Sequence, residues 1–309
     1  MDWMGQLPIE TQLKPINQII LPGSHDSGAY TLNLIKCNSK PVLRAVAWLG
    51  TKNTRVKNII QKWTLTHQDK IYKQLVNGIR VLDLRISSIS SSEFCVSHTF
   101  GCTGLESVLT QINEFVVAHP TEIVILQCCP DYANRLQMTP TDHSNVLACF
   151  KSVFGTKLAS VTQTFPSYKD LIENKTQILV FYTPFQSGLN FVWSDSLMTD
   201  PWTNTSTLSV KQAELRLDIA NLVNHQTKYN NITFTLTPQL GDLIKGFFVE
   251  RSLYQLSSTI RSTLPNFLEL HSGNLDHLSC IKFDFPSTQD IIEVINLNYE
   301  KCPFGSNKV

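Results

Sequence analysis

The sequence has no apolar run long enough to span a membrane. A spanning helix needs about 18 or more consecutive apolar residues, and even the run Val42–Leu49 is short and contains Arg44. The N-terminus lacks the basic charge and the apolar region of a signal peptide, because Asp2 stands where a basic residue is usual. We therefore expect a soluble protein, cytoplasmic or peripherally associated with a membrane, without a signal peptide or a transmembrane helix.

The chain also has little excess charge of either sign. Its 26 lysines and arginines nearly balance its 25 acidic residues, which leaves a net charge of +1. Proteins that bind nucleic acid usually concentrate positive charge on one face, and this balance gives no sign of such a face. Hydrophobic residues make up 42% of the chain, as in ordinary globular proteins. Nucleic acid is therefore not expected among the partners.

Cysteines are too sparse for a disulfide scaffold, since there are eight in 309 residues. They also lack the spacing of a zinc site: Cys128 and Cys129 are adjacent, while Cys95 and Cys102 have no close companions. We expect reduced, mostly structural thiols and no metal bound by cysteine.

An alternation of apolar strands and amphipathic helices fills the chain. The predicted strands are the run from Ile19, Ile79–Ile86, Phe94–His98, Ile123–Leu126, Ile178–Tyr182, Ile232–Leu236 and Ile281–Phe285. The predicted helices are Val56–Gln74, Leu105–Ala118, Val146–Phe154, Val210–Asn224, Leu253–Ser262 and Thr288–Leu297, and Ser87–Ser92 is predicted to be a turn. This alternation favours a (β/α) barrel over an open sheet. At this length we expect a single α/β domain over residues 1–309, with its core at about residues 15–300.

The stretch Ile19–Gly28 presents a histidine and an aspartate at the end of a buried strand. Apolar residues lead into a Pro-Gly turn, and His25 and Asp26 follow between small residues that leave room for a ligand. A lone His-Asp pair more often caps a turn than forms a site. The functional interpretation therefore depends on what the other strands contribute.

Other predicted strands supply matching ionisable residues. Asp83 and Arg85 alternate onto the same face of one strand, His98 ends another, and Asp284 lies in a late one. Catalytic groups of such barrels gather at the carboxyl ends of several strands. We expect these four residues to meet the His25-Asp26 pair there.

The expected cluster contains the groups that general acid-base cleavage of a phosphodiester requires. Two imidazoles, whose usual pKa is about 6.5, can act as base and acid near neutral pH. Carboxylates can fix the orientation and tautomer of the imidazoles. An arginine offers a rigid pair of donors that matches phosphate oxygens.

Several motifs together resemble the phosphatidylinositol-specific phospholipase C X-domain family, both its stand-alone X-domain proteins and its bacterial members. The motifs are Leu21–Ser27, Gly78–Ile86 and Phe94–His98, together with Trp63, Gln74-Leu75, Pro120–Leu126, Pro201-Trp202, Asp284 and Val294–Asn298. They occur in the family's order over nearly the whole chain. The resemblance implies a distorted, incompletely closed (β/α)8 TIM barrel.

The resemblance also implies a role for each residue of the cluster. His25 would take the proton from the inositol 2-hydroxyl, oriented by Asp284, and the attack on phosphorus would give diacylglycerol and a cyclic inositol phosphate. His98, paired with Asp26, would protonate the departing diacylglycerol oxygen. The remaining two members are Arg85, which would neutralise a phosphate oxygen, and Asp83, which would help to fix the cluster.

Two positions bear on metal and substrate, and the second departs from the family. Calcium-dependent members have a carboxylate where this chain has Arg85, so the resemblance implies cleavage without calcium or another cofactor. Relatives usually carry a basic residue after the strand near Leu126, where this chain has Gln127-Cys128-Cys129-Pro130. Gln127 and Cys129 are therefore candidate substrate-binding residues, and the head group need not be plain inositol.

Trp48 lies where relatives have a short helix at the rim of the active site that can touch bilayers. An aromatic residue in an amphipathic segment suits a membrane interface, and a core position is an equal alternative. The implied partners are thus a phospholipid substrate and, transiently, a membrane surface, with no obligate protein partner. Surface or ordinary polar roles are expected for the remaining histidines, His67, His119, His143, His225, His271 and His277, and loop roles for Asp195 and Asp200.

Two alternatives to an active phospholipase remain open at this point. The first is a catalytically weak lipid head-group binding protein on the same fold. The second is a metal-dependent glycerophosphodiesterase on a similar barrel. Two histidines with Arg85 favour catalysis over binding alone, and the second alternative would need an acidic cluster near His25, which the pairing of Asp83 with Arg85 argues against.

Overall fold

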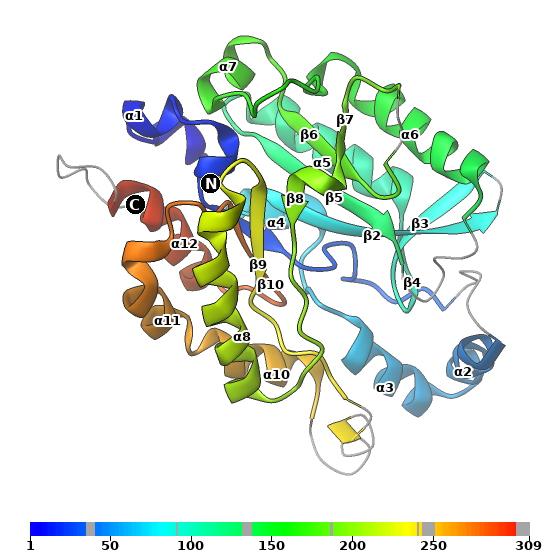
Figure 1. Ribbon diagram of the computed structural model, residues 1–309. Coiled ribbons are helices and arrows are strands. Elements are labelled where there is room, and N and C mark those ends of the chain that lie inside the picture. The colour runs from blue at the N-terminus through cyan, green and yellow to red at the C-terminus, as the bar shows by residue number, and fades with distance from the viewer. Residues whose placement is uncertain are drawn as a thin grey trace.

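A barrel of parallel strands forms the centre of the protein (Figure 1). The computed structural model describes residues 1–34, 41–90, 92–131, 138–185, 188–239, 241–242 and 251–300. Around the barrel the strand order is β7-β6-β5-β2-β1-β10-β9-β8, and every neighbouring pair is parallel. These strands are β1 (Leu21–Ser24), β2 (Val81–Ser90), β5 (Val124–Pro130), β6 (Ile178–Tyr182), β7 (Val192–Ser194), β8 (Met198–Thr199), β9 (Tyr229–Thr233) and β10 (Cys280–Phe283).

The barrel is not fully closed. β7 and β8 are neighbours in the chain, separated by the single turn Asp195–Leu197, yet no ladder joins them within the described residues. Both strands are short, so they carry little of the alternation from which a strand can be predicted, and the sequence did not indicate them. The predicted distorted and incompletely closed (β/α)8 barrel is confirmed.

An antiparallel hairpin extends the sheet outside the barrel. Its strands are β3 (Glu93–His98), which pairs with β2, and β4 (Phe100–Gly104), which pairs with β3. Because β2 continues to Ser90, most of the predicted serine-rich turn belongs to the hairpin. Ser87 is buried there, with its hydroxyl 2.6 Å from that of Ser97. The hairpin places the end of β3 beside the barrel strands.

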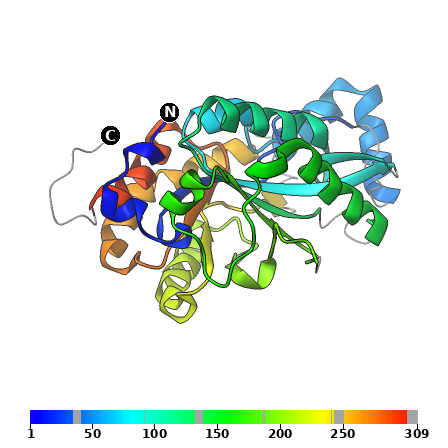
Figure 2. The same cartoon turned by 90° about the horizontal axis from the view of Figure 1, so that it is seen from above.

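Helices cover the outside of the barrel (Figures 1 and 2). They are α1 (Ile9–Gln12), α2 (Pro41–Lys52), α3 (Thr54–Thr64), α4 (Ile71–Val76), α5 (Leu105–Ala118), α6 (Pro140–Phe154), α7 (Tyr168–Glu173), α8 (Leu208–Asn221), α10 (Leu253–Arg261), α11 (Leu264–His271) and α12 (Thr288–Glu300). In Figure 1, α2 and α3 lie next to each other, away from α11 and α12. Among the described residues, no helix combines the length and apolar character needed to cross a membrane.

The prediction of one helix over Val56–Gln74 was wrong in its middle. The chain forms α3 and α4 instead, and between them Leu65 has an extended backbone with φ −73° and ψ 133°. The amide of Thr66 bonds the carbonyl of Ala29 rather than a helical carbonyl. Tertiary hydrogen bonds thus override a helical pattern at this point. Elsewhere α5 and β6 have their predicted bounds.

The N-terminal segment closes the barrel at the amino ends of its strands. Trp3 and Met4 are buried there. Arg80, just before β2, donates from Nε to Glu122 Oε2 at 2.8 Å and from Nη2 to the Met1 carbonyl at 2.7 Å. Glu122 also accepts from the Met4 amide at 3.2 Å. One fully buried ion pair therefore fastens the N-terminus to β2 and β5.

Replacing Glu122 with glutamine is expected to lower the free energy of unfolding by about 3–5 kcal/mol, because it leaves the Arg80 guanidinium buried without a counter-charge. Urea unfolding measures this loss. The matched control is Glu173→Gln, which breaks the exposed pair with Lys169 (3.7 Å) and should cost less than about 1 kcal/mol. Equal losses in the two variants would show that burial of this pair does not matter.

Candidate active site

His25 and Asp284 come together because β1 and β10 are paired in parallel. Ser24 is opposite Phe283 in that ladder, so the residues that follow the two strands are neighbours. The His25 amide also donates to the Phe283 carbonyl at 2.9 Å. His25 Nδ1 lies 2.8 Å from Asp284 Oδ1, with both side chains almost fully buried. The carboxylate accepts from Nδ1–H, which leaves Nε2 of the neutral imidazole free to act as a base.

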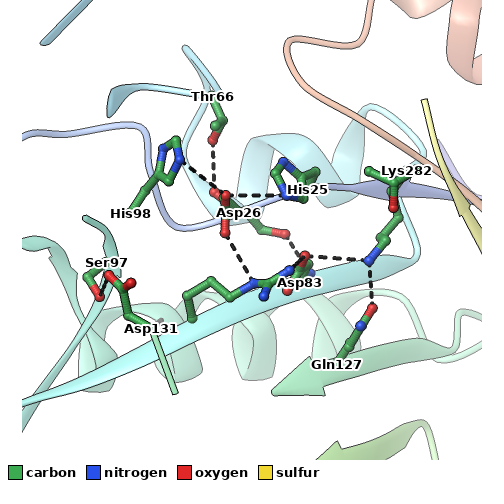
Figure 3. A network of polar contacts seen from close by, with 12 residues as sticks. His25, Asp26, Thr66, Asp83, Ser97, His98, Gln127, Asp131 and Lys282 are labelled. Atoms are coloured by element: carbon green, nitrogen blue, oxygen red, sulfur yellow. Dashed lines mark hydrogen bonds and ion pairs between the residues drawn. The ribbon is translucent and has the colours of Figure 1, made fainter. Parts of the chain in front are cut away.

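Asp26 lies between the two imidazoles (Figure 3). Its Oδ2 is 3.6 Å from His98 Nε2 and 3.4 Å from His25 Nε2. The predicted pairing of Asp26 with His98 is present in the structure, although the same oxygen also faces His25. His98 Nδ1 donates to the Thr64 carbonyl at 2.7 Å, because a carbonyl can only accept. This bond turns His98 Nε2 towards Asp26.

Arg85 connects the two acidic residues from the other side. Its Nη2 donates to Asp83 Oδ2 at 2.8 Å, and its Nε is 3.3 Å from Asp26 Oδ1. Burial alone would raise the pKa of Asp83, but Arg85 and Lys282 outweigh it and hold that pKa well below its usual range. Asp83 is therefore ionised across the working pH range and keeps the guanidinium in place.

The pKa of His25 is raised above its usual value. Burial disfavours the charged imidazolium, but the nearby carboxylates of Asp26 and Asp284 outweigh burial. A ring of Trp202 stacks on the imidazole, with centroids 5.0 Å apart and planes at 23°. His25 is thus a base strengthened by two acids and held between a carboxylate and an indole.

One cavity of about 410 Å³ contains these groups. Its lining residues are His25, Asp26, Arg85, His98, Thr99, Asp131, Asp200, Trp202, Asn204, Thr235, Leu236, Thr237, Pro238, Leu253 and Asp284. Asp83 lies beneath, bonded to Arg85. The structure therefore brings together all six residues that the sequence predicted as catalytic.

Lys282 and Asp200 belong to the same region but were missed from the sequence. Lys282 is fully buried in the barrel, with Nζ 2.7 Å from Asp200 Oδ2 and 3.5 Å from Asp83 Oδ2. Burial opposes its charge, yet these carboxylates raise its pKa. Lys282 precedes Asp284 by two positions, so strand alternation could have placed both on the inner face. Asp200, expected to be a loop residue, lines the cavity.

The predicted substrate contacts, Gln127 and Cys129, lie outside the main cavity. The Gln127 Oε1 accepts from Lys282 at 2.9 Å (Figure 3). Its Nε2 donates to Asp200 at 2.6 Å. Both residues line a smaller neighbouring cavity of about 300 Å³. Burial raises the pKa of the Cys129 thiol to about 12. Lys282 brings a positive charge to Gln127 from a different strand.

The other predictions for single residues have mixed outcomes. His67 and His143 are buried, so of the surface or ordinary polar roles predicted for them the surface position is excluded. His143 has an ordinary polar role, with Nδ1 2.9 Å from the Tyr182 hydroxyl. Trp48 on α2 is 61% exposed, which removes the alternative of a core position.

Three potential metal ligands of the site already bind protein groups. Single ligand atoms of His25, Asp26 and Asp83 lie within 4.8 Å of one another. Both carboxylates, however, contact the Arg85 guanidinium, and calcium requires six to eight oxygen ligands. A cation here would sit against a fixed positive charge, so the residues present do not suit calcium.

The fold is that of the bacterial phosphatidylinositol-specific phospholipase C barrels. The structure superposes on a phosphatidylinositol-specific phospholipase C from Listeria monocytogenes with a TM-score of 0.70, covering 96% of this chain and 97% of that one, at 16% identity. The model of the phosphatidylinositol-specific phospholipase C X domain matches residues 52–183 of this chain.

Stand-alone X-domain proteins are similar over nearly the full chain. PI-PLC X domain-containing protein 3 of Danio rerio is 28% identical over 96% of this chain and 93% of its own length. PI-PLC X domain-containing protein 2 of Mus musculus is 26% identical over 96% of this chain and 87% of its own length. The resemblance noted in the sequence is confirmed.

Proposed function

We propose that this protein is a phosphodiesterase of phospholipase C type, which cleaves a phosphatidylinositol-like lipid to diacylglycerol and a cyclic inositol phosphate. The observation that carries the proposal is the position of Asp26 between two imidazoles in one cavity, 3.4 Å from His25 Nε2 and 3.6 Å from His98 Nε2. Binding alone does not need two such groups facing one space. Two such groups are needed by a reaction that takes a proton from the attacking hydroxyl and gives one to the departing oxygen.

In the first step, His25 Nε2 takes the proton of the head-group hydroxyl next to the phosphate. That oxygen forms a bond to phosphorus while the bond from phosphorus to the diacylglycerol oxygen breaks. The departing oxygen receives a proton from the His98 imidazolium. Asp284 stabilises the imidazolium that forms at His25, as the acid of a catalytic triad does. In a second step, water can open the cyclic phosphate with the two histidines exchanging roles.

Arg85 would act on the charge that builds up on the phosphate oxygens. Its guanidinium is held by Asp83 and Asp26 before substrate binds, so little reorganisation is needed during the reaction. Because the guanidinium occupies the place of a cation between these carboxylates, we propose that cleavage requires no metal. Chelator should leave the activity unchanged.

The charges of the cavity favour a head group with one phosphate. Four carboxylates line it, from Asp26, Asp131, Asp200 and Asp284, against the single guanidinium of Arg85. Further phosphates on the head group would meet this negative charge. We therefore propose phosphatidylinositol, or a similar lipid rich in hydroxyls, over lipids with a multiply phosphorylated ring.

The test is to incubate the protein with a panel of phospholipids in detergent, with and without chelator, and to detect diacylglycerol and cyclic phosphate. We expect cleavage of phosphatidylinositol and loss of that cleavage in His25→Ala and His98→Ala. Binding of a head group without cleavage would instead support a lipid-binding protein. Cleavage that chelator abolishes would support a metal-dependent phosphodiesterase.

The midpoint of the acid limb of the pH profile of kcat/KM is expected above pH 6.5. A base works only when neutral, and the pKa of His25 is raised, so kcat/KM should rise with pH through a midpoint higher than the usual histidine value. Asp284→Asn removes one of the carboxylates that raise this pKa, and should move the midpoint to lower pH. Rates measured from about pH 5 to 9 give both midpoints. A wild-type midpoint at or below 6.5, or an upward shift in Asp284→Asn, would contradict this assignment.

We also propose that α2 touches the membrane surface through Trp48. Trp48 and Leu49 are 61% and 47% exposed on this helix. Trp48→Ala should weaken binding to phosphatidylinositol-containing vesicles about tenfold, the loss expected for partial burial of an indole in the interface. Leu217→Ala, which removes a side chain 57% exposed on α8, is the control and should change nothing. Unchanged sedimentation of Trp48→Ala with vesicles would refute the contact.

A further inference from the structure

Each of three residues in the proposed chemistry is directly followed by a residue with left-handed backbone. His25 precedes Asp26 (φ 45°), His98 precedes Thr99 (φ 65°), and Asp284 precedes Phe285 (φ 46°). Residues with a side chain rarely adopt this conformation, because Cβ crowds the backbone. Within the part of the chain that the structure describes, Lys175 is the only other non-glycine residue with positive φ. Such turns persist only where surrounding contacts hold them.

One short segment, Thr64–His67, contacts the turns at His25, Asp284 and His98. The Thr66 hydroxyl donates to the Asp26 carbonyl at 2.9 Å, as Figure 3 shows. The Thr66 carbonyl accepts from the Phe285 amide at 2.7 Å. Thr66 therefore holds the left-handed residues of both strand ends that carry the base and its acid partner.

The neighbours of Thr66 complete the contacts to the histidines. His67 Nε2 lies 2.8 Å from the His25 carbonyl, so this nitrogen carries the hydrogen and donates it. At the start of the segment, the Thr64 carbonyl accepts from His98 Nδ1 at 2.7 Å. The segment itself is anchored, because Thr66 is completely buried and its amide bonds the Ala29 carbonyl at 2.9 Å. This explains why the chain leaves the helix at Leu65.

We propose that Thr66 and His67 are positioning residues, which set the distance between the base His25 and the acid His98 by holding the left-handed turns in place. The inference rests on the proposed function. Neither side chain lines the cavity of the two histidines, so neither touches substrate there. Both act through the backbone that carries His25 and Asp26. A misplacement of about 1 Å in such a pair can cost about a hundredfold in rate.

Thr66→Val tests the hydroxyl, because valine keeps the branched shape and the backbone bonds and removes only the donor. We expect kcat to fall about 10- to 100-fold with KM changed less than about threefold. Thr66→Ser restores the donor and should recover kcat to within about threefold. Thr11→Val is the matched control. Thr11 lies on α1, is equally buried and donates to the Asn298 carbonyl at 3.4 Å. It should leave kcat unchanged.

His67 allows an independent second test. Glutamine can place an amide donor near the position of Nε2, whereas phenylalanine cannot donate. His67→Phe should lower kcat at least about tenfold and His67→Gln should retain most of it. His143→Phe, which removes a buried histidine bonded to Tyr182, is the control for packing.

The outcomes separate this inference from the proposed function. A kcat of Thr66→Val within twofold of wild type, or failure of Thr66→Ser to recover it, overturns the positioning role. So does an equal loss in Thr11→Val at equal thermal stability. If the wild type cleaves no lipid, the proposed function fails, and imidazole NMR signals decide the inference alone. Shifts of the His25 and His98 signals in Thr66→Val, with His143 unmoved, then support it, and unmoved signals overturn it.

Discussion

Replacing His98 with alanine is expected to slow cleavage of a diacylglycerol-linked substrate about 10³-fold, but to slow release of a nitrophenol from the same head group by less than about tenfold. Loss of a general acid typically costs about 10²–10⁴ in rate when the leaving group is a poor one. An alkoxide must be protonated as it departs. A nitrophenolate leaves without a proton, so the substrate then needs His98 far less.

The same comparison in His25→Ala separates the two histidines. The nucleophilic hydroxyl must lose its proton whatever the leaving group, so His25→Ala should slow both substrates about equally, by at least about 10³-fold. Measuring kcat for the two substrates in the two variants gives four ratios. Equal losses on both substrates in His98→Ala would remove His98 from the role of acid. If His25→Ala instead lost much less activity on the nitrophenol-releasing substrate than on the lipid, the two roles would have to be exchanged.

The geometry supports the two roles that we propose for these residues. His25 Nδ1 is engaged by the Asp284 carboxylate, which stabilises a proton gained at Nε2. His98 Nδ1 is engaged by a neutral carbonyl, that of Thr64, at the C-terminal end of α3. His98 Nδ1 therefore keeps its hydrogen on a neutral acceptor, and its Nε2 faces the Asp26 carboxylate. Asp26 faces both imidazoles, so its carboxylate is placed to stabilise a proton on either of them.

The sequence was sufficient to predict the parts of the site that depend on short-range order. His25 and Asp284 directly follow buried strands, and parallel pairing then makes them neighbours whatever the loops do. Asp83 and Arg85 share one face of β2 by alternation. Local patterns thus indicated the strands and the shared face of Asp83 and Arg85, whereas the contact of His25 with Asp284 was implied by the family resemblance, because β1 and β10 are far apart in the chain.

Long-range contacts determined what the sequence did not predict. The break between α3 and α4 is caused by bonds from Thr66 to Ala29 and Phe285, which no local pattern reports. Lys282 is charged in a strand that is otherwise buried, and its stability there depends on Asp200, some 80 residues away in the chain. An unpaired lysine at that position would be expensive. The position of Lys282 could therefore not be predicted without knowing which acidic residues pair with it.

The interior lysine also changes the interpretation of the missing basic residue after β5. Gln127 is opposite Asp83 in the β2–β5 ladder, and its amide oxygen accepts from Lys282. The positive charge expected near this position is thus that of Lys282 on β10. Its ammonium group is paired with Asp83 and Asp200 and does not line the cavity. Arg85 is left as the only arginine or lysine among the described residues that line the cavity. Under the proposed function, stabilisation of the phosphate by lysine or arginine then depends on one side chain.

Replacing Arg85 with lysine is accordingly expected to lower kcat about 10²–10³-fold, with KM changed much less. Lysine keeps the charge but has no planar fork, so it cannot bond Asp83 and Asp26 and still present a donor to the phosphate. Steady-state kinetics on phosphatidylinositol measure the loss. The matched control is Arg261→Lys. Arg261 lies on α10, is similarly buried and is 2.7 Å from Asp290. The kcat of this variant should equal that of the wild type. If Arg85→Lys keeps half of the wild-type kcat, charge alone suffices and the fork geometry has no role.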